Sequence, residues 1–205
     1  MTTPQQDQTI LSSATLNVAD PAPLGLAGFA GTTFMLSVIN TGMLTGEVTG
    51  AVLGLALFYG GLAQLLAGMW EFFRGNTFGA LAFSSYGAFW MSYWLLVDHI
   101  LPGLEAPSAD VGHAVGLYLL VWTIFTAYMT IAAIRVSGAV LAVFIALTLT
   151  FLALCIGELA TATAFTKIGG WLGIITALLA WYTSLAGVAN FTFGKTVFPV
   201  FPARS

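Results

Sequence analysis

The side chains of this chain that could do chemistry are hydroxyls and amides placed inside long apolar stretches. Thr32 and Thr33 lie in the first stretch, Gln64 in the second, and Ser84 and Ser85 in the third. Such groups can line a path for a small polar solute, but a Ser or Thr hydroxyl can also bond its own helix or join two helices. Gln64 is the strongest candidate for a path, because an amide satisfies its hydrogen bonds less easily than a hydroxyl.

The motifs of several enzyme classes are absent from the sequence. It contains no HExxH motif, no Gly-rich phosphate loop and no pair of carboxylates within an apolar stretch. The two histidines, His99 and His113, lie near the ends of stretches. We therefore expect no enzyme activity, no metal and no cofactor. A membrane protein with a polar path and no ATPase domain is a channel or a secondary transporter.

The composition is that of an integral membrane protein. Hydrophobic residues make up 59% of the 205 residues and charged residues only 6%, whereas about a quarter of residues are charged in soluble domains. A helix needs roughly 20 apolar residues to cross a hydrocarbon core of about 30 Å. Six segments are long enough, at residues 24–44, 48–70, 78–97, 111–134, 136–156 and 168–190. The sequence predicts an all-α membrane protein with six transmembrane helices.

The basic residues predict the orientation of the chain. Arg74, Arg135, Lys195 and Arg204 fall on the side of the N-terminus, and Lys167 falls on the other side. Because short cytoplasmic loops carry an excess of Lys and Arg, we expect a multi-pass protein of the plasma (inner) membrane with both termini in the cytoplasm. Residues 1–19 would form a polar cytoplasmic tail, residues 20–195 the six-helix domain, and residues 196–205 a short C-terminal tail.

Ionisable side chains near the apolar segments are confined to the segment ends, as the cost of a charge at the membrane centre requires. The candidates are Glu71, Asp98, His113 and Glu158. Solvated boundary positions are typical of such groups. Glu158, at the end of the fifth segment, is the best single choice for a proton-linked group.

The first apolar segment opens with the run Asp20-Pro21-Ala22-Pro23-Leu24-Gly25-Leu26. Asp is favoured at a helix N-cap, and Pro suits the first turn because it presets φ and lacks an N–H. Gly25, Gly28 and Gly31 then follow on one helix, where they allow another backbone or a small ligand to approach closely. The run predicts a helix that is capped by Asp20.

This opening run resembles the Asn-Pro-Ala-Pro-Leu-Gly-Leu signature of the acetate uptake transporter family, which includes the bacterial succinate–acetate permease. The resemblance continues through most of the chain, in the runs FYGGLAQ at 58–64, LAG at 66–68, GNTFG at 75–79, AFSSYGAFW at 82–90 and GWLG at 170–173. Asp20 departs from the family's Asn. An ionised Asp20 would compete with an anion at the helix N-terminus, so we expect it to cap the helix without binding substrate.

The resemblance implies a six-helix protomer that assembles as a hexamer, with a separate path through each protomer. The substrates would be acetate and, in some members, succinate. A hydrophobic gate of Phe29, Tyr86 and Leu147 would close the path. The residues expected along the path are Pro21, Leu24, Gly25, Thr32, Thr33, Gln64, Ser84, Ser85 and Ala180, the last at a position linked to specificity.

Three functions are compatible with the residues. The first is a transporter or channel for acetate and related small carboxylates, with either proton symport or facilitated passage. The second is a channel for a small neutral solute such as urea or ammonia, which the mild polarity of the apolar segments also allows. The third is a membrane scaffold or sensor without transport, which would have no continuous polar path.

Overall fold

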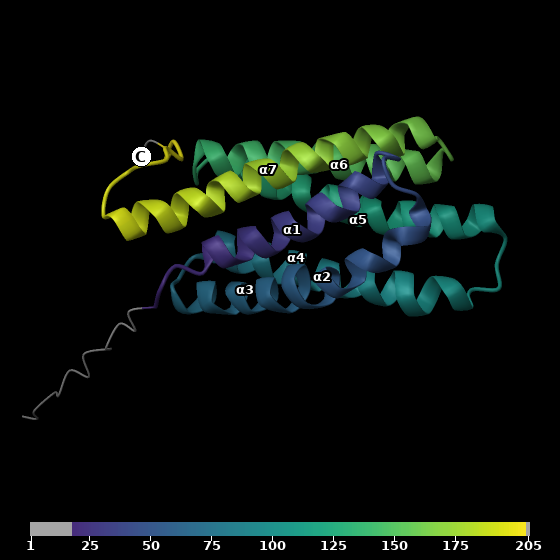
Figure 1. Cartoon of the computed structure of the whole chain (residues 1–205), viewed down its shortest axis with the longest axis horizontal. Helices are drawn as coiled ribbons and strands as arrows, with labels where there is room; N and C mark the ends of the chain where they lie inside the picture. The colour runs from purple at the N-terminus through teal and green to yellow at the C-terminus, as the bar shows by residue number, and fades with distance from the viewer. Residues whose placement is uncertain (1–17, 204–205) are drawn as a thin grey trace, which may run out of the picture.

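Helices form almost all of residues 18–203, the part of the chain that this computed structural model describes (Figure 1). The long helices are α1 (Ala22–Asn40), α3 (Gln64–Phe73), α4 (Thr77–Leu95), α5 (Ser108–Ala133), α6 (Gly138–Leu159) and α7 (Thr163–Phe193). No β-strand occurs in the described range. The predicted all-α class is confirmed. The expected tail over residues 1–19 lies outside the described residues except for its last two positions, as do residues 204 and 205.

Five helical segments are long and apolar enough to cross a membrane, namely α1, the stretch Gly46–Phe73, α5, α6 and α7. α4 also has 19 residues and no charged side chain, but its Ser, Tyr and Trp residues lower its mean hydropathy. Together these elements cover the six predicted segments. The largest difference is at α7, which begins at Thr163, before the predicted start at residue 168.

The second segment is not one regular helix. It consists of a 3₁₀ turn η1 (Gly46–Val52), a short α2 (Leu53–Leu57), a π-helical turn η2 (Phe58–Ala63) and then α3. A π-turn inserts one residue relative to the α-helical period and rotates everything that follows. The side chains of α3 therefore face a direction that a regular helix through residues 48–70 would not give them.

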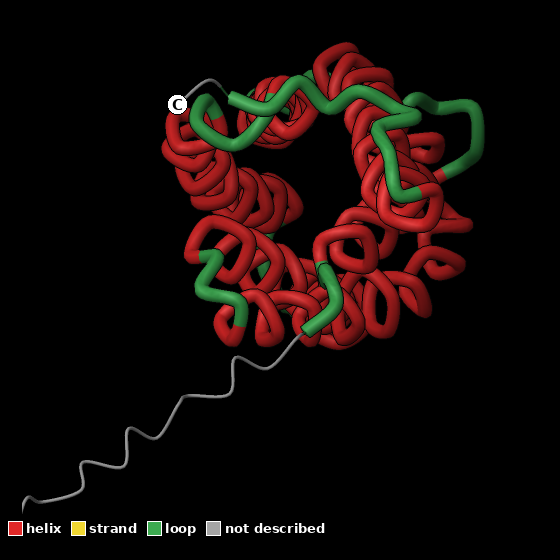
Figure 2. The backbone as a smooth tube through the Cα atoms, turned by 90° about the vertical axis from the view of Figure 1, so that its left-hand side faces the viewer, coloured by secondary structure: helices red, strands yellow, loops and turns green. Residues whose placement is uncertain are grey.

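The helices run along the long axis of the bundle and surround a common centre (Figures 1 and 2). α7 packs along α1 and α6, α6 packs along α5, and α3 packs along α4. Aromatic side chains link α4 to α5: the rings of Tyr86 and Phe125 lie 5.3 Å apart, and those of Phe89 and Trp122 lie 5.0 Å apart. The described chain begins and ends at the same end of the bundle.

The outer surface of the bundle is apolar, as a lipid environment requires. On α5 the side chains of Leu117, Val121, Ile124 and Ile131 are all more than half exposed. The interior cluster instead contains aromatic and small residues, Phe29, Tyr86 and Ala180 among them. An apolar outer surface of this kind fits a protein whose outside contacts lipid tails or further subunits.

The start of α1 differs from the prediction by one residue. The N-cap is Pro21, whose φ of −80° and ψ of −13° are already helical, and Gly25 donates its N–H to the Pro21 carbonyl. Because the proline ring holds φ in the helical range, helical bonding starts there, one residue after Asp20, and the side chain of Asp20 caps this end of the helix. Asp20 still accepts the Ala22 N–H at 3.1 Å and pairs with Arg74.

The segment that follows α7 folds back onto the bundle as far as residue 203. The Asn190 amide oxygen accepts the N–H groups of Val197 and Phe198 at 2.7 and 2.9 Å. Farther along, Gly138 donates its N–H to the Phe201 carbonyl at 2.7 Å, and Pro202 forms an isolated bridge with Ser137. The carbonyls of this segment thus satisfy N–H groups at the start of α6.

Candidate functional site

The described part of the chain encloses a cavity toward each end of the bundle. The near cavity, at the end where the described chain begins and ends, has a volume of about 90 Å³ and reaches Ala22, Asn76 and Val136. The far cavity has a volume of about 440 Å³ and reaches Asn40 and Glu158 at the other end. A water molecule needs only about 10–15 Å³ of such space. Each cavity can therefore hold a small solute.

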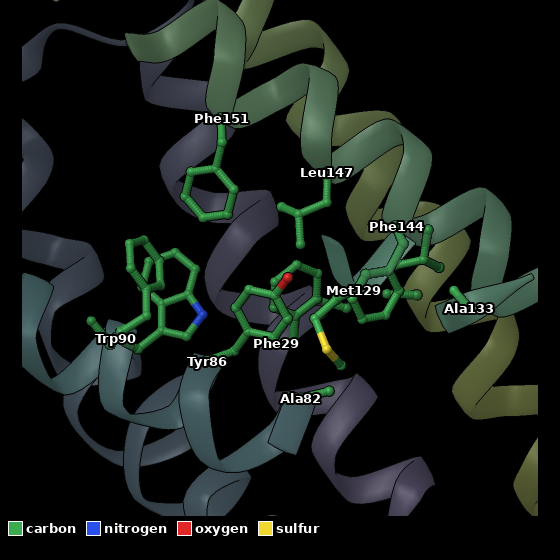
Figure 3. Packing of buried hydrophobic residues seen from close by; sticks show 14 residues of the cluster. Phe29, Ala82, Tyr86, Trp90, Met129, Ala133, Phe144, Leu147 and Phe151 are labelled. Atoms are coloured by element: carbon green, nitrogen blue, oxygen red, sulfur yellow. The ribbon is translucent and has the colours of Figure 1, made fainter. Parts of the chain in front are cut away.

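Phe29 of α1 and Leu147 of α6 line both cavities and so stand between them. Tyr86 of α4 lines the near cavity beside them, with its ring centroid 5.7 Å from that of Phe29. Each of the three side chains is only 3% exposed. Figure 3 shows the Leu147 side chain pointing toward Phe29 and Tyr86. These three side chains, from three helices, therefore form an apolar constriction between the two cavities.

The Tyr86 hydroxyl is engaged within the protein. It lies 2.9 Å from the Thr126 hydroxyl, and Thr126 donates its own proton to the Trp122 carbonyl at 2.7 Å. Tyr86 is consequently the donor to Thr126. Its ring contributes apolar surface to the constriction, and its proton is not free for a solute.

The near cavity has an apolar wall with one polar strip. Gln64 and Glu71, two turns apart along α3, and Asn76 of the following turn line it. Glu71 is fully buried and Gln64 is 1% exposed. Asn76 donates from Nδ2 to Glu71 Oε2 at 2.9 Å, whereas Glu71 Oε1 and Gln64 Oε1 find no partner within residues 18–203. The strip therefore presents acceptor oxygens that a bound donor could satisfy.

The far cavity is larger and carries unpartnered donors beside the constriction. Thr33 and Trp90 both line it, and their side chains are 6% and 2% exposed. Neither Thr33 Oγ1 nor Trp90 Nε1 has a partner in the described part of the chain. Figure 3 shows the indole nitrogen of Trp90 on the side that faces Tyr86 and Phe29. An indole N–H and a hydroxyl are suited to hold the oxygen atoms of a carboxylate.

The predicted path residues divide into two groups. Thr33 and Gln64 line a cavity, as does Glu158, the predicted proton-linked group. The others pack helices or face outward. Thr32 donates to the Gly28 carbonyl at 3.0 Å and lies 3.3 Å from that of Leu55. Six further predicted path residues line neither cavity, namely Pro21, Leu24, Gly25, Ser84, Ser85 and Ala180.

These remaining residues have identifiable packing positions. Ser84 packs against the backbone of Gly68, and the ring of Phe83 covers Gly25. Ala180 is fully buried in the interior cluster, whereas Leu24 is 45% exposed. Cavity residues that were not anticipated are Asn76 and Trp90, together with the inward position of Glu71. Asn76 and Trp90 stand in the runs GNTFG and AFSSYGAFW that carry the family resemblance, and Glu71 is visible as an acidic residue adjoining an apolar segment.

Comparison with known proteins gives a consistent result. The profile of the GPR1/FUN34/yaaH family matches residues 3–203. The Escherichia coli succinate-acetate/proton symporter SatP is 39% identical over 183 residues, which cover 89% of this chain and 95% of that protein. The solved structure of the bacterial acetate channel SatP superposes with a TM-score of 0.83 at 38% identity, covering 89% of this chain and 99% of that chain.

A yeast relative has a different name. The ammonia transport outward protein 2 of Saccharomyces cerevisiae is 42% identical over 175 residues, or 84% of this chain. The chain spans 62% of the length of that relative.

Proposed function

The chain belongs to the GPR1/FUN34/yaaH family, and we propose that it passes acetate and related small carboxylates, succinate included, across a membrane. The observation that carries the proposal is the pair of cavities that meet at Phe29 and Leu147. Two solute-sized chambers separated by one apolar constriction form an interrupted path, which a scaffold would not need. The names of the bacterial relatives support the choice of substrate.

In the proposed cycle the far cavity receives the carboxylate. The Trp90 N–H and the Thr33 hydroxyl hold its oxygens just outside the constriction. Phe29, Tyr86 and Leu147 act as a hydrophobic gate, because an apolar constriction excludes water and with it a hydrated anion. A bare carboxylate in apolar surroundings is very costly, so the substrate crosses as the neutral acid. Symport of the anion with a proton and passage of the neutral acid then both move one carboxylate and one proton. Glu158, which lines the far cavity, is the proposed proton-linked group there.

The proposed setting is the plasma (inner) membrane, with both chain ends in the cytoplasm and six protomers in a homo-hexamer. The common end at which the described chain begins and ends supports the topology. Arg74 and Arg135 follow α3 and α5 at that end, as cytoplasmic loops favour. The broad apolar outer face of α5 supports further subunit contacts.

Counterflow of labelled acetate in proteoliposomes tests the proposal. Purified protein should exchange acetate saturably, and excess unlabelled succinate should compete. Rapid flux of a neutral solute without any saturable acetate exchange would contradict it.

Substitution of Trp90→Phe should raise the half-saturation concentration for acetate about tenfold. The change removes one N–H donor to a charged oxygen, a hydrogen bond worth about 1.5–3 kcal/mol, and about 1.4 kcal/mol corresponds to a factor of ten. The concentration dependence of counterflow measures it. Trp171→Phe is the matched control, because Trp171 is 55% exposed on the outer face. An unchanged half-saturation concentration would remove Trp90 from the binding site.

Ammonia is the second candidate substrate. The yeast relative's name favours it, and the unpartnered acceptor oxygens of Gln64 and Glu71 could accept N–H donors as readily as an acid O–H. Stopped-flow measurement of internal pH after an ammonium chloride jump separates the two. Faster alkalinisation than in protein-free vesicles, without acetate counterflow, would favour ammonia.

A further inference from the structure

Glu71 is a buried carboxyl group with one oxygen engaged and one free. Oε2 accepts the Asn76 amide at 2.9 Å, while Oε1 has no hydrogen-bond partner among the residues that the structure describes. The side chain is fully buried and lines the near cavity. An unpartnered oxygen at such a position is costly unless a ligand or a proton satisfies it.

Glycine at residue 79 leaves the space that the Glu71 carboxyl group occupies. A Cβ at Gly79, in the first turn of α4, would lie 2.8 Å from both Cδ and Oε1 of Glu71. Any side chain at residue 79 would therefore displace the carboxyl group. Asn76 links the same group to α4, because its Oδ1 accepts the Gly79 N–H at 3.1 Å while its amide nitrogen binds Glu71. The carboxyl group is thus held at a fixed place against the first turn of α4, on a side chain that lines the cavity.

Glu71 forms no ion pair within residues 18–203. The charged groups that act on Glu71 are Asp20, before α1, and Arg74, after α3, and these two pair with each other. Neither α1 nor α4 contains an acidic or basic residue. Tyr59 is the titratable group of η2, and Tyr86, which shares the cavity, donates to Thr126. Glu71 is therefore the one carboxyl group among the described residues that line the near cavity.

We propose that Glu71 is the proton acceptor of the near cavity, and that its ligand is a small carboxylic acid in the neutral form. The inference rests on the proposed function, because it takes the substrate as it emerges from the constriction. The O–H bond of the acid breaks and its electron pair stays on the substrate carboxylate. A lone pair of Glu71 Oε1 forms the new O–H bond. The substrate leaves as the anion, and Glu71 later releases the proton to water at the near end.

Gln64 prepares this step. It stands two turns before Glu71 on the same helix, about 10 Å along the axis at 1.5 Å per residue, and it is nearer to the middle of the bundle. Its amide can exchange hydrogen bonds with the neutral acid without taking the proton. The acid therefore meets a neutral polar group first and a proton acceptor second. It loses its proton only after it has passed the constriction.

The Glu71→Gln variant tests the proposal, because a glutamine keeps the size of the side chain and can still accept the Asn76 amide. In proteoliposomes we expect the acetate uptake rate to fall about tenfold or more, since general acid–base groups typically contribute about 10²–10⁴-fold. Glu105→Gln, an exposed carboxylate between α4 and α5, is the matched control and should leave uptake unchanged. Equal melting temperatures and elution volumes establish that both variants are folded.

Infrared difference spectra supply a second readout that a purely structural role would not move. Adding acetate to the wild-type protein should produce the carbonyl band of a protonated protein carboxyl group, unaffected by ¹³C in the acetate. The band should be absent in Glu71→Gln and present in Glu105→Gln. A band that persists in Glu71→Gln, or uptake that equals that of the wild type, would overturn the role of Glu71 while leaving acetate transport intact. Absence of acetate uptake by the wild type would instead overturn the proposed function.

Discussion

Substitution of Leu147→Ala will open a continuous passage between the near and far cavities. Leu147 lines both and closes the gap beside Phe29, so its shortening leaves space that water and larger solutes can occupy. Lowering a barrier by about 1.4 kcal/mol raises a rate about tenfold, and we expect a rise of at least that size for benzoate, which is bulkier than acetate. Uptake of labelled benzoate and acetate into proteoliposomes measures the change.

The cost in stability separates this result from general damage. Leu→Ala at a buried site typically costs about 2–5 kcal/mol, so the melting temperature should fall. Leu149→Ala is the matched control on the same helix, because Leu149 is 46% exposed and lines neither cavity. If benzoate uptake rises equally in both variants, Leu147 does not form the gate. If it rises in neither while the proteins are folded, the constriction lies elsewhere.

Substitution of Gly87→Val will prevent α4 from packing against the second segment. A Cβ at residue 87 would lie 2.6 Å from the Leu65 nitrogen and 2.9 Å from the Gly61 carbonyl oxygen. These are backbone atoms, which cannot move aside as a flexible side chain could. Overpacking costs about 1–3 kcal/mol and occasionally more, and here α4 would also move Tyr86 away from Phe29. We expect loss of the monodisperse peak in size-exclusion chromatography.

Gly54→Val is the control for this prediction. The space around a Cβ at Gly54 is empty to 4 Å among residues 18–203, although the residue is also helical. This variant should be recovered in normal yield with acetate uptake intact. Normal recovery of Gly87→Val would show that the two segments can separate without loss of the fold.

The fold could be predicted closely because membrane spans follow from length and composition alone. The six segments differ from the helices by only a few residues at most ends, and the extension of α7 to Thr163 lies in a stretch too polar for a hydropathy pattern to include. The π-turn at Phe58–Ala63 was not predictable in this way. It depends on how Gly60 and Gly61 pack against other helices rather than on local periodicity.

The site could be predicted only in part, because a helical pattern does not reveal which face points inward. The structure places Phe29, Tyr86 and Leu147 together, as the family resemblance implied, while their action as a gate stays a prediction. Thr32 and Ser84 look equally polar in the sequence, yet both are used in packing. Glu71 looked like a solvated boundary residue. The turn after α3 instead folds Asn76 back onto its carboxyl group and buries it.

The return of the C-terminal segment to the start of α6 bears on how the protein can be labelled. Pro202 pairs with Ser137, next to Val136, which lines the near cavity. A fluorescent reporter or affinity tag joined directly after Ala203, which donates its N–H to the Val136 carbonyl at 3.4 Å, therefore begins at the rim of that cavity. A short linker would place a bulky domain over the opening and could pull Phe201 away from Gly138. Reporter fusions to this end need a long flexible linker to record transport without obstructing it.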